Sequence, residues 1–207
     1  MYGILAALLG YVFGCINGSE IIGKYKKINI KQTGMKNAGA TNTAVILGVK
    51  YGIIVAAIDI LKAIISLYIL STILNNMFIM PDIQTILLFI NGLFVIIGHN
   101  YPITMKFQGG KGTASLFGVL LYFDWRFAVL GFMILVIFSL ISNYFVFGTL
   151  ILYVSFMLYT TYIYGRVPGV ITLVYMGFFF IKHIDNFKRI VNKEEVMVSS
   201  LFRREAN

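Results

Sequence analysis

Long apolar stretches alternate with short polar loops along the whole chain. The stretches expected to form helices cover about 2–22, 43–74, 83–98, 113–123, 127–140, 144–164 and 170–181. A membrane-spanning helix needs roughly 17–25 residues, so the membrane span is the natural unit of this chain. The stretch 113–123 is too short to cross at a right angle unless the bilayer thins there. The pattern predicts an all-α polytopic membrane protein with about seven transmembrane helices and one domain over residues 1–207.

The positions of the Lys and Arg residues give this arrangement an orientation. With seven crossings and the N-terminus outside, every basic residue falls on the inner side except Arg126, Arg166 and the intramembrane Lys62. Because cytoplasmic loops are enriched in Lys and Arg, the C-terminus is expected in the cytoplasm. If the stretch 113–123 did not cross the membrane, the basic tail would lie outside and this bias would be lost.

Composition favours a membrane protein over a soluble one. Hydrophobic residues make up 59% of the 207 residues and charged residues only 12%, whereas soluble domains carry about 25% charged residues. The net charge of +9 does not predict a nucleic-acid partner, because the basic residues lie in the gaps between apolar spans and not in one patch. The single Cys15 excludes an internal disulfide and argues against a cysteine-based metal site. We expect no metal, no cofactor and no obligate protein partner.

Two glycine-containing polar loops precede apolar helices. The first, 29–42, ends in Asn-Ala-Gly-Ala-Thr-Asn, and the second, 98–113, contains Gly-Gly-Lys-Gly. Backbone N–H groups at the start of a helix, together with a lysine, can bind an anion. The candidate ligands for a phosphate are Lys36, Asn37, Gly39, Thr41, Asn42, His99, Gly109, Gly110, Lys111 and Gly112. Thr41 and Asn42 are also natural N-caps for the next helix, so an ordinary capped loop and a flexible re-entrant turn are the structural alternatives.

Two further groups of polar residues lie in or beside apolar helices. If the tail is helical, His183 and Asn186 share a face and Arg189 lies about one turn on. His183 taken alone is also typical of an interfacial residue. Asp59 and Lys62, spaced i and i+3, can pair inside the membrane, where an unpaired charge is costly. This pair is either a structural ion pair or part of an active-site charge network.

These segments, in this order, resemble the bacterial membrane acylphosphate:glycerol-3-phosphate acyltransferase family. The family motifs read roughly D-I-R-x-x-G-S-G-N-x-G-A-T-N, G-H-x-F-P-x-F-x-x-F-K-G-G-K-G-x-A and H-x-x-N-I-x-R-L-x-x-G-x-E. The chain reads N-I-K-Q-T-G-M-K-N-A-G-A-T-N, G-H-N-Y-P-I-T-M-K-F-Q-G-G-K-G-T-A and H-I-D-N-F-K-R-I-V-N-K-E-E. The family also carries an aspartate–lysine pair in its second helix, like Asp59 and Lys62.

The resemblance implies a seven-helix enzyme of the bacterial inner membrane whose active site faces the cytoplasm. It would transfer an acyl group from acyl phosphate to the 1-hydroxyl of glycerol 3-phosphate, which yields lysophosphatidic acid and phosphate for phospholipid biosynthesis. The resemblance implies catalytic roles for Lys111, His183 and Asn186. It also implies phosphate binding by the glycine loop and by Arg189, and structural roles for Asp59, Lys62 and Glu195.

The chain departs from the family pattern at several positions in the polar loops. Met35 and Lys36 replace Ser-Gly, which removes a hydroxyl donor. Asn29 and Lys31 replace Asp and Arg, so a guanidinium fork becomes a point charge, and Gln108 replaces a lysine. Two alternatives therefore stay open: a diverged paralogue that acylates another phosphorylated polyol, and a non-catalytic anion-binding or transport protein.

Overall fold

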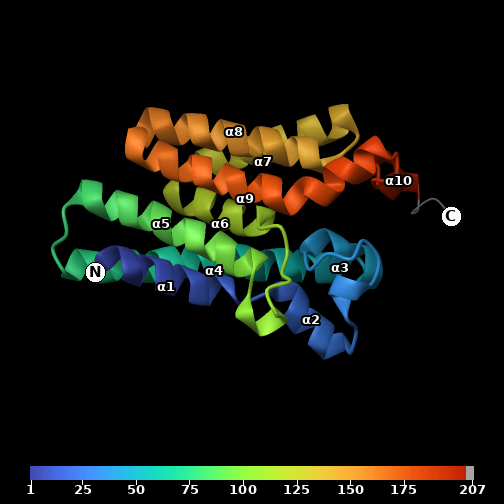
Figure 1. The fold of residues 1–207 in the computed structure, drawn as a ribbon, viewed down its shortest axis with the longest axis horizontal. Coiled ribbons are helices and arrows are strands. Elements are labelled where there is room, and N and C mark those ends of the chain that lie inside the picture. Colours follow the sequence, from blue (N-terminus) through green and yellow to red (C-terminus); the bar gives the residue numbers. More distant parts are fainter. Residues whose placement is uncertain (204–207) are drawn as a thin grey trace. The chain divides into compact units, whose positions relative to one another are not determined.

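The computed structural model describes residues 1–203, and in that part of the chain every regular element is a helix (Figure 1). The described residues contain six segments that are long and apolar enough to cross a membrane. These segments are Tyr2–Lys26, Val49–Asn76, Pro81–Met105, Trp125–Ser142, Phe145–Tyr164 and Arg166–Val191. The expected all-helical membrane fold is confirmed.

The helices group into two compact units, Met1–Phe123 and the part that follows from Asp124. That residues 1–207 form a single domain stays a prediction. The first unit contains α1 (Tyr2–Gly14), α2 (Gly18–Lys26), α3 (Ala40–Leu47), α4 (Val49–Asn76), α5 (Pro81–Asn100) and α6 (Thr113–Phe123), with short 3-10 turns η1 (Ile30–Gln32) and η2 (Ile103–Met105). Within it, α1 packs along α5, and α4 contacts α1, α5 and α6 (Figure 1).

Small residues allow the helices of this unit to approach closely. A Cβ added to Gly10 would lie 2.3 Å from the carbonyl oxygen of Asn91, and one added to Gly118 would lie 2.3 Å from that of Ile60. Asn91 also donates to the carbonyl of Ala6 at 3.0 Å. Membrane helices associate through such close backbone contacts and interhelical hydrogen bonds, because lipid supplies no hydrophobic driving force between them.

Helix breaks interrupt the first two apolar stretches expected from the sequence, 2–22 and 43–74. The first break separates α1 from α2, and the Oδ1 of Asn17 caps α2 by accepting from the N–H groups of Ser19 at 3.0 Å and Glu20 at 3.2 Å. The second break is Gly48, whose φ of +92° suits glycine, so the expected span 43–74 is divided into α3 and α4.

The expected N-caps of α3 were wrong. The helix begins at Ala40 with Gly39 as its N-cap, so Thr41 and Asn42 lie inside the first turn. Asn42 is buried and its side chain bonds to the preceding loop instead.

The second unit contains α7 (Trp125–Ser142), α8 (Phe145–Tyr164), α9 (Arg166–Val191) and α10 (Val198–Arg203). Within this unit α8 packs against α7 and α9. The helix α9 continues well past the expected end at 181, so the polar residues of the tail lie on a regular helix. The start of α10 docks on the α7–α8 turn, where Asn143 accepts from the N–H groups of Val198 at 2.9 Å and Ser199 at 2.8 Å.

Whether the chain crosses the membrane six or seven times depends on the short helix α6. It has 11 residues, which is about 16 Å of helix against a hydrocarbon core of about 30 Å. The seven-crossing topology and the orientation of the termini therefore stay predictions.

Candidate functional site

Lys62 lies at the centre of a buried polar cluster between α1, α4 and α5. Its Nζ lies 2.8 Å from the Oδ1 of Asp59 and 2.8 Å from the Nδ1 of His99. The same ammonium donates to the carbonyl oxygens of Ile16 at 2.6 Å and Gly14 at 3.2 Å. These carbonyls lie at the break after α1, where the helix no longer supplies N–H partners. Asp59 and Lys62 thus form a structural ion pair that also fixes a histidine.

His99 connects this cluster to the glycine-rich loop. The Nδ1 of His99 also lies 3.4 Å from the Oδ1 of Asp59. Where Nδ1 accepts from the Lys62 ammonium, the neutral ring carries its proton on Nε2. This Nε2 faces Gly110, because a Cβ added there would lie 2.2 Å from it and 2.5 Å from the carbonyl oxygen of Ala38. Ala38 belongs to the first polar loop. The two loops singled out in the sequence therefore meet at Gly110.

The glycine-rich loop runs back along the end of α5 and leads directly into α6. The N–H groups of Gly109 and Gly110 donate to the carbonyls of Asn100 and His99, each at 3.1 Å. Gly112 has a φ of +86°, a conformation that residues with a Cβ rarely adopt. Lys111 is half-buried between these glycines, and α6 begins at the next residue after Gly112.

The buried side chain of Asn42 forms hydrogen bonds with the backbone of the first polar loop. Its Oδ1 accepts from the N–H of Met35 at 2.7 Å. Its Nδ2 lies 2.8 Å from the carbonyl of Ile30, 3.0 Å from that of Thr33 and 2.9 Å from that of Asn37. An amide used in this way fixes the shape of the loop that carries Asn37, Ala38 and Gly39.

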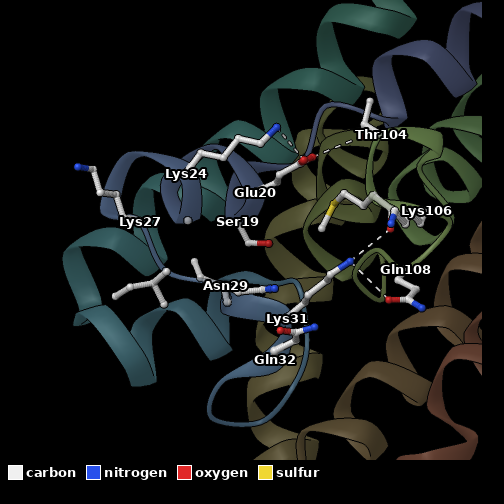
Figure 2. Close-up of a pocket in the computed structure, with 14 residues that line it drawn as sticks. Ser19, Glu20, Lys24, Lys27, Asn29, Lys31, Gln32, Thr104, Lys106 and Gln108 are labelled. Carbon is white, nitrogen blue, oxygen red and sulfur yellow. Dashed lines mark hydrogen bonds and ion pairs between the residues drawn. The ribbon is translucent and has the colours of Figure 1, made fainter.

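A basic pocket of about 650 Å³ lies between α2, η1 and the loop after α5 (Figure 2). Lys31 reaches across it, with its Nζ 3.4 Å from the carbonyl of Met105 and 3.4 Å from the Oε1 of Gln108 (Figure 2). The lining residues are Ser19, Glu20, Gly23, Lys24, Lys27, Ile28, Asn29, Ile30, Lys31, Gln32, Thr104, Met105, Lys106 and Gln108.

None of the candidate site residues chosen from the sequence lines this pocket. Three positions noted as departures from the family pattern, Asn29, Lys31 and Gln108, do line it. The dense run of lysines in 24–31 was a signal in the sequence. Which of those lysines share a pocket with the loop after α5 depends on the fold.

In the second unit, His183, Asn186 and Arg189 lie along α9. The Nδ1 of His183 lies 2.8 Å from the carbonyl of Phe179, so the neutral ring carries its proton on Nδ1 and offers Nε2 as an acceptor. The Nδ2 of Asn186 donates to one oxygen of Glu195 at 2.7 Å, and the Nε of Arg189 donates to the other at 2.6 Å. Glu195 thereby orients both side chains.

The remaining candidates differ in exposure. Lys36 and Thr41 are exposed on the first loop, Asn37 and Gly39 are half-buried, and His183 and Asn186 are buried on α9. Lys36 has a φ of +50°, which turns the loop sharply just before Asn37.

Comparison with known proteins gives one consistent match. Residues 4–193 match the family described as glycerol-3-phosphate acyltransferase. The chain is 50% identical over 207 residues, 100% of each chain, to glycerol-3-phosphate acyltransferase 1 of Oceanobacillus iheyensis. It is 33% identical over 199 residues to the glycerol-3-phosphate acyltransferase of Bacillus subtilis, which covers 95% of this chain and 98% of that one.

A solved structure has the same fold. The structure resembles the crystal structure of PlsY (YgiH), an integral membrane glycerol 3-phosphate acyltransferase, in its glycerol 3-phosphate form, with a TM-score of 0.83 at 26% identity. The match covers 97% of this chain and 98% of that one. The lysophosphatidic acid form of the same protein matches with a TM-score of 0.80 over 95% of each chain.

Proposed function

Because this chain belongs to the glycerol-3-phosphate acyltransferase family, we propose that it takes its acyl group from an acyl phosphate and transfers it to the 1-hydroxyl of glycerol 3-phosphate. The chain is an integral membrane glycerol-3-phosphate acyltransferase of phospholipid biosynthesis. The proposed products are lysophosphatidic acid and inorganic phosphate. We place the active site on the cytoplasmic side of the bacterial inner membrane, where the basic loops are expected.

The meeting of the two polar loops at Gly110 carries this proposal. Two anionic substrates have to be held side by side, and loops rich in backbone N–H groups beside a lysine suit phosphate. The close approach of Gly110 to both His99 and Ala38 brings two such loops together within one unit. We assign the phosphate-binding role to the loop formed by Gly109, Gly110, Lys111 and Gly112, in which the N–H groups of Gly109 and Gly110 bond back to α5 and hold the loop in shape.

The proposed chemistry needs positioning more than covalent catalysis. An acyl phosphate is a mixed anhydride, so its carbonyl carbon is already activated. The hydroxyl oxygen of glycerol 3-phosphate attacks that carbon, the bond to the phosphate oxygen breaks, and phosphate leaves with the electron pair. Holding the two substrates in line can supply about 7–11 kcal/mol. The Lys111 ammonium and loop N–H groups would stabilise the charge that develops on the carbonyl and phosphate oxygens.

His183, Asn186 and Arg189 of the second unit are proposed to supply further groups for the reaction. His183 offers an acceptor Nε2 in its neutral form, and Asn186 offers an amide held by Glu195. Either His183 or a phosphate oxygen of the substrate accepts the hydroxyl proton. Arg189, held by the same carboxylate, is proposed to neutralise a substrate phosphate.

The remaining candidates of the first unit divide into ligands and positioning residues. Asn37, Gly39 and Thr41 are proposed to contact phosphate together with Lys36. The buried Asn42 is proposed to act through the shape of their loop. Asp59 and Lys62 are proposed to position His99.

Acyl transfer by the purified protein tests the proposal. We expect labelled acyl phosphate to be consumed with glycerol 3-phosphate as acceptor, and acyl-CoA to be a poor donor. Lys111→Ala and His183→Ala should lower turnover while the helical circular dichroism is kept, and the exposed Lys50→Ala should have no effect. Transfer to another phosphorylated polyol but not to glycerol 3-phosphate would support the paralogue reading. Full turnover in both variants would contradict the assigned site.

A further inference from the structure

The basic pocket beside α2 has a chemistry of its own. Four lysines line it, Lys24, Lys27, Lys31 and Lys106, and Glu20 is the one carboxylate among its lining residues in the described part of the chain. Glu20 pairs with Lys24 at 2.9 Å, so one positive charge is balanced locally. The remaining lysines give the pocket a net positive charge, which attracts an anion.

Two of these lysines occupy backbone positions that glycine would fit with less strain. Lys27 is the C-cap of α2 with a φ of +56°, and Lys106 is the C-cap of η2 with a φ of +54°. A residue at such a position commonly is glycine, because a Cβ is disfavoured in the left-handed conformation. A lysine supplies charge that glycine cannot. Both lysines line the pocket, on opposite sides of it, and the Lys27 side chain extends outward (Figure 2).

Apolar side chains alternate with the lining residues on the same segments. Ile21 and Tyr25 on α2 are 47% and 74% exposed, and Ile103 and Phe107 after α5 are 63% and 57% exposed. Exposed aliphatic and aromatic residues beside lysines are typical of a membrane–water interface. A freely dissolved anion would gain nothing from exposed apolar residues on these segments, whereas the chains of a lipid could contact them.

We propose that this pocket binds the phosphate headgroup of an anionic membrane lipid. Its lining draws residues from both polar loops but contains none of the residues assigned above to the substrates. Its volume of about 650 Å³ accommodates a glycerophosphate headgroup. The lysines that line the pocket would neutralise the phosphate, while Ser19 and Asn29 offer neutral hydrogen-bonding groups. The inference does not depend on the identity of the acyl donor.

Equilibrium binding to the purified full chain in detergent tests the site. The probes are short-chain phosphatidic acid, phosphatidylcholine of the same chain length, and inorganic phosphate. The triple variant K24Q/K27Q/K106Q is compared with K50Q/R126Q/R166Q, which removes the same charge from exposed residues elsewhere. We expect phosphatidic acid to bind at least tenfold more weakly to the pocket variant and unchanged to the control variant.

Three results would overturn the proposal. Equal weakening in both triple variants would indicate a general charge effect. Inorganic phosphate that binds as tightly as phosphatidic acid and with the same dependence on these lysines would indicate a site for free anions. Loss of lipid binding in Lys111→Ala, a residue outside the pocket, would place the lipid in the substrate site. Acyl transfer by wild-type protein is measured in the same preparations, so a missing product counts against the proposed reaction and not against the pocket.

Discussion

The Nζ of Lys62 lies 2.8 Å from the Nδ1 of His99, so a side chain of α4 contacts the ring on α5 that faces the glycine loop. Where Nδ1 accepts from the Lys62 ammonium, the neutral ring presents an Nε2–H donor to the glycine loop. The same ammonium is bonded to Asp59 and to two carbonyls at the end of α1. One buried cation thus links three helices to the loop proposed to bind phosphate.

Replacing Lys62 with Met should destabilise the protein strongly. The change leaves the carboxylate of Asp59 buried without its partner, and breaking a buried ion pair in this way costs about 3–5 kcal/mol. Thermal unfolding in detergent would show a lower midpoint than for Lys50→Met, a change at an exposed lysine. The double variant Asp59→Asn/Lys62→Met should recover part of the loss. A single variant as stable as wild type would contradict the role given to this cluster.

Gly110→Ala should abolish most of the activity. The new Cβ would lie 2.2 Å from the Nε2 of His99 and 2.5 Å from the backbone oxygen of Ala38, so the two loops have to separate. A misplacement of about 1 Å in a positioning enzyme can cost about 10²-fold in rate. Turnover of acyl phosphate measures the effect. Gly3→Ala, where a Cβ meets nothing within 4 Å, is the matched control and should behave like wild type.

Glu195→Gln should lower kcat more than it raises KM. The carboxylate accepts from both Asn186 and Arg189, and a glutamine has only one oxygen with which to replace those two bonds. Misalignment of Asn186 should reduce turnover by about 10²-fold. Steady-state kinetics with both substrates varied separates the two parameters. The neighbouring exposed Glu194→Gln tests whether charge alone matters, and an equal loss there would argue against positioning.

The stability contributed by Asp124 should depend on pH. The hydroxyl of Tyr159 donates to this carboxylate and holds its pKa below the ordinary value. A lowered folded-state pKa stabilises the protein above the ordinary Asp pKa of about 3.9, and this stabilisation is lost as the pH falls through the lowered value.

Tyr159→Phe tests this linkage. The variant should melt at a lower temperature than wild type at neutral pH, and the gap should close as the pH falls below about 4. Tyr162→Phe, at a side chain that is 87% exposed, provides the comparison. A gap that does not change with pH would show that the hydrogen bond does not favour the charged form.

Seven crossings predict opposite sides for two engineered cysteines in a Cys15→Ala background. With α6 crossing the membrane, Arg166→Cys should react with an impermeant maleimide in intact cells, and Ser200→Cys should react only after the cells are opened. Phe78→Cys, in the loop after α4, should be labelled from outside with either six or seven crossings. The reverse pattern at the first two positions would indicate six crossings.

The sequence predicted the helical architecture and the polar loops well, because both are local properties. Apolar length locates the spans, and the spacing of His183, Asn186 and Arg189 places them along one helix, as α9 confirms. The second apolar stretch, 43–74, was long enough to contain a break, and the break lies at Gly48. The start of α3 was predicted three residues late, since Asn42 is a good N-cap by residue type but its side chain instead bonds to four backbone groups of the preceding loop.

Contacts between distant segments could not be predicted from the sequence. The pairing of Asp59 with Lys62 follows from their spacing, but the bond from Lys62 to His99 joins residues 37 apart in sequence. The pocket lysines come from α2, η1 and the loop after α5, and no pattern in these segments indicates that they share a cavity. Long-range packing sets both arrangements.

The bend between α1 and α2 has a consequence for biosynthesis. The carbonyls of Gly14 and Ile16 receive hydrogen bonds from Lys62, which the ribosome adds more than forty residues later. A newly inserted N-terminal segment lacks that donor, and lipid offers no substitute for it. The hydrogen bonding of the N-terminal segment is therefore complete only after α4 has been synthesised and has packed beside it.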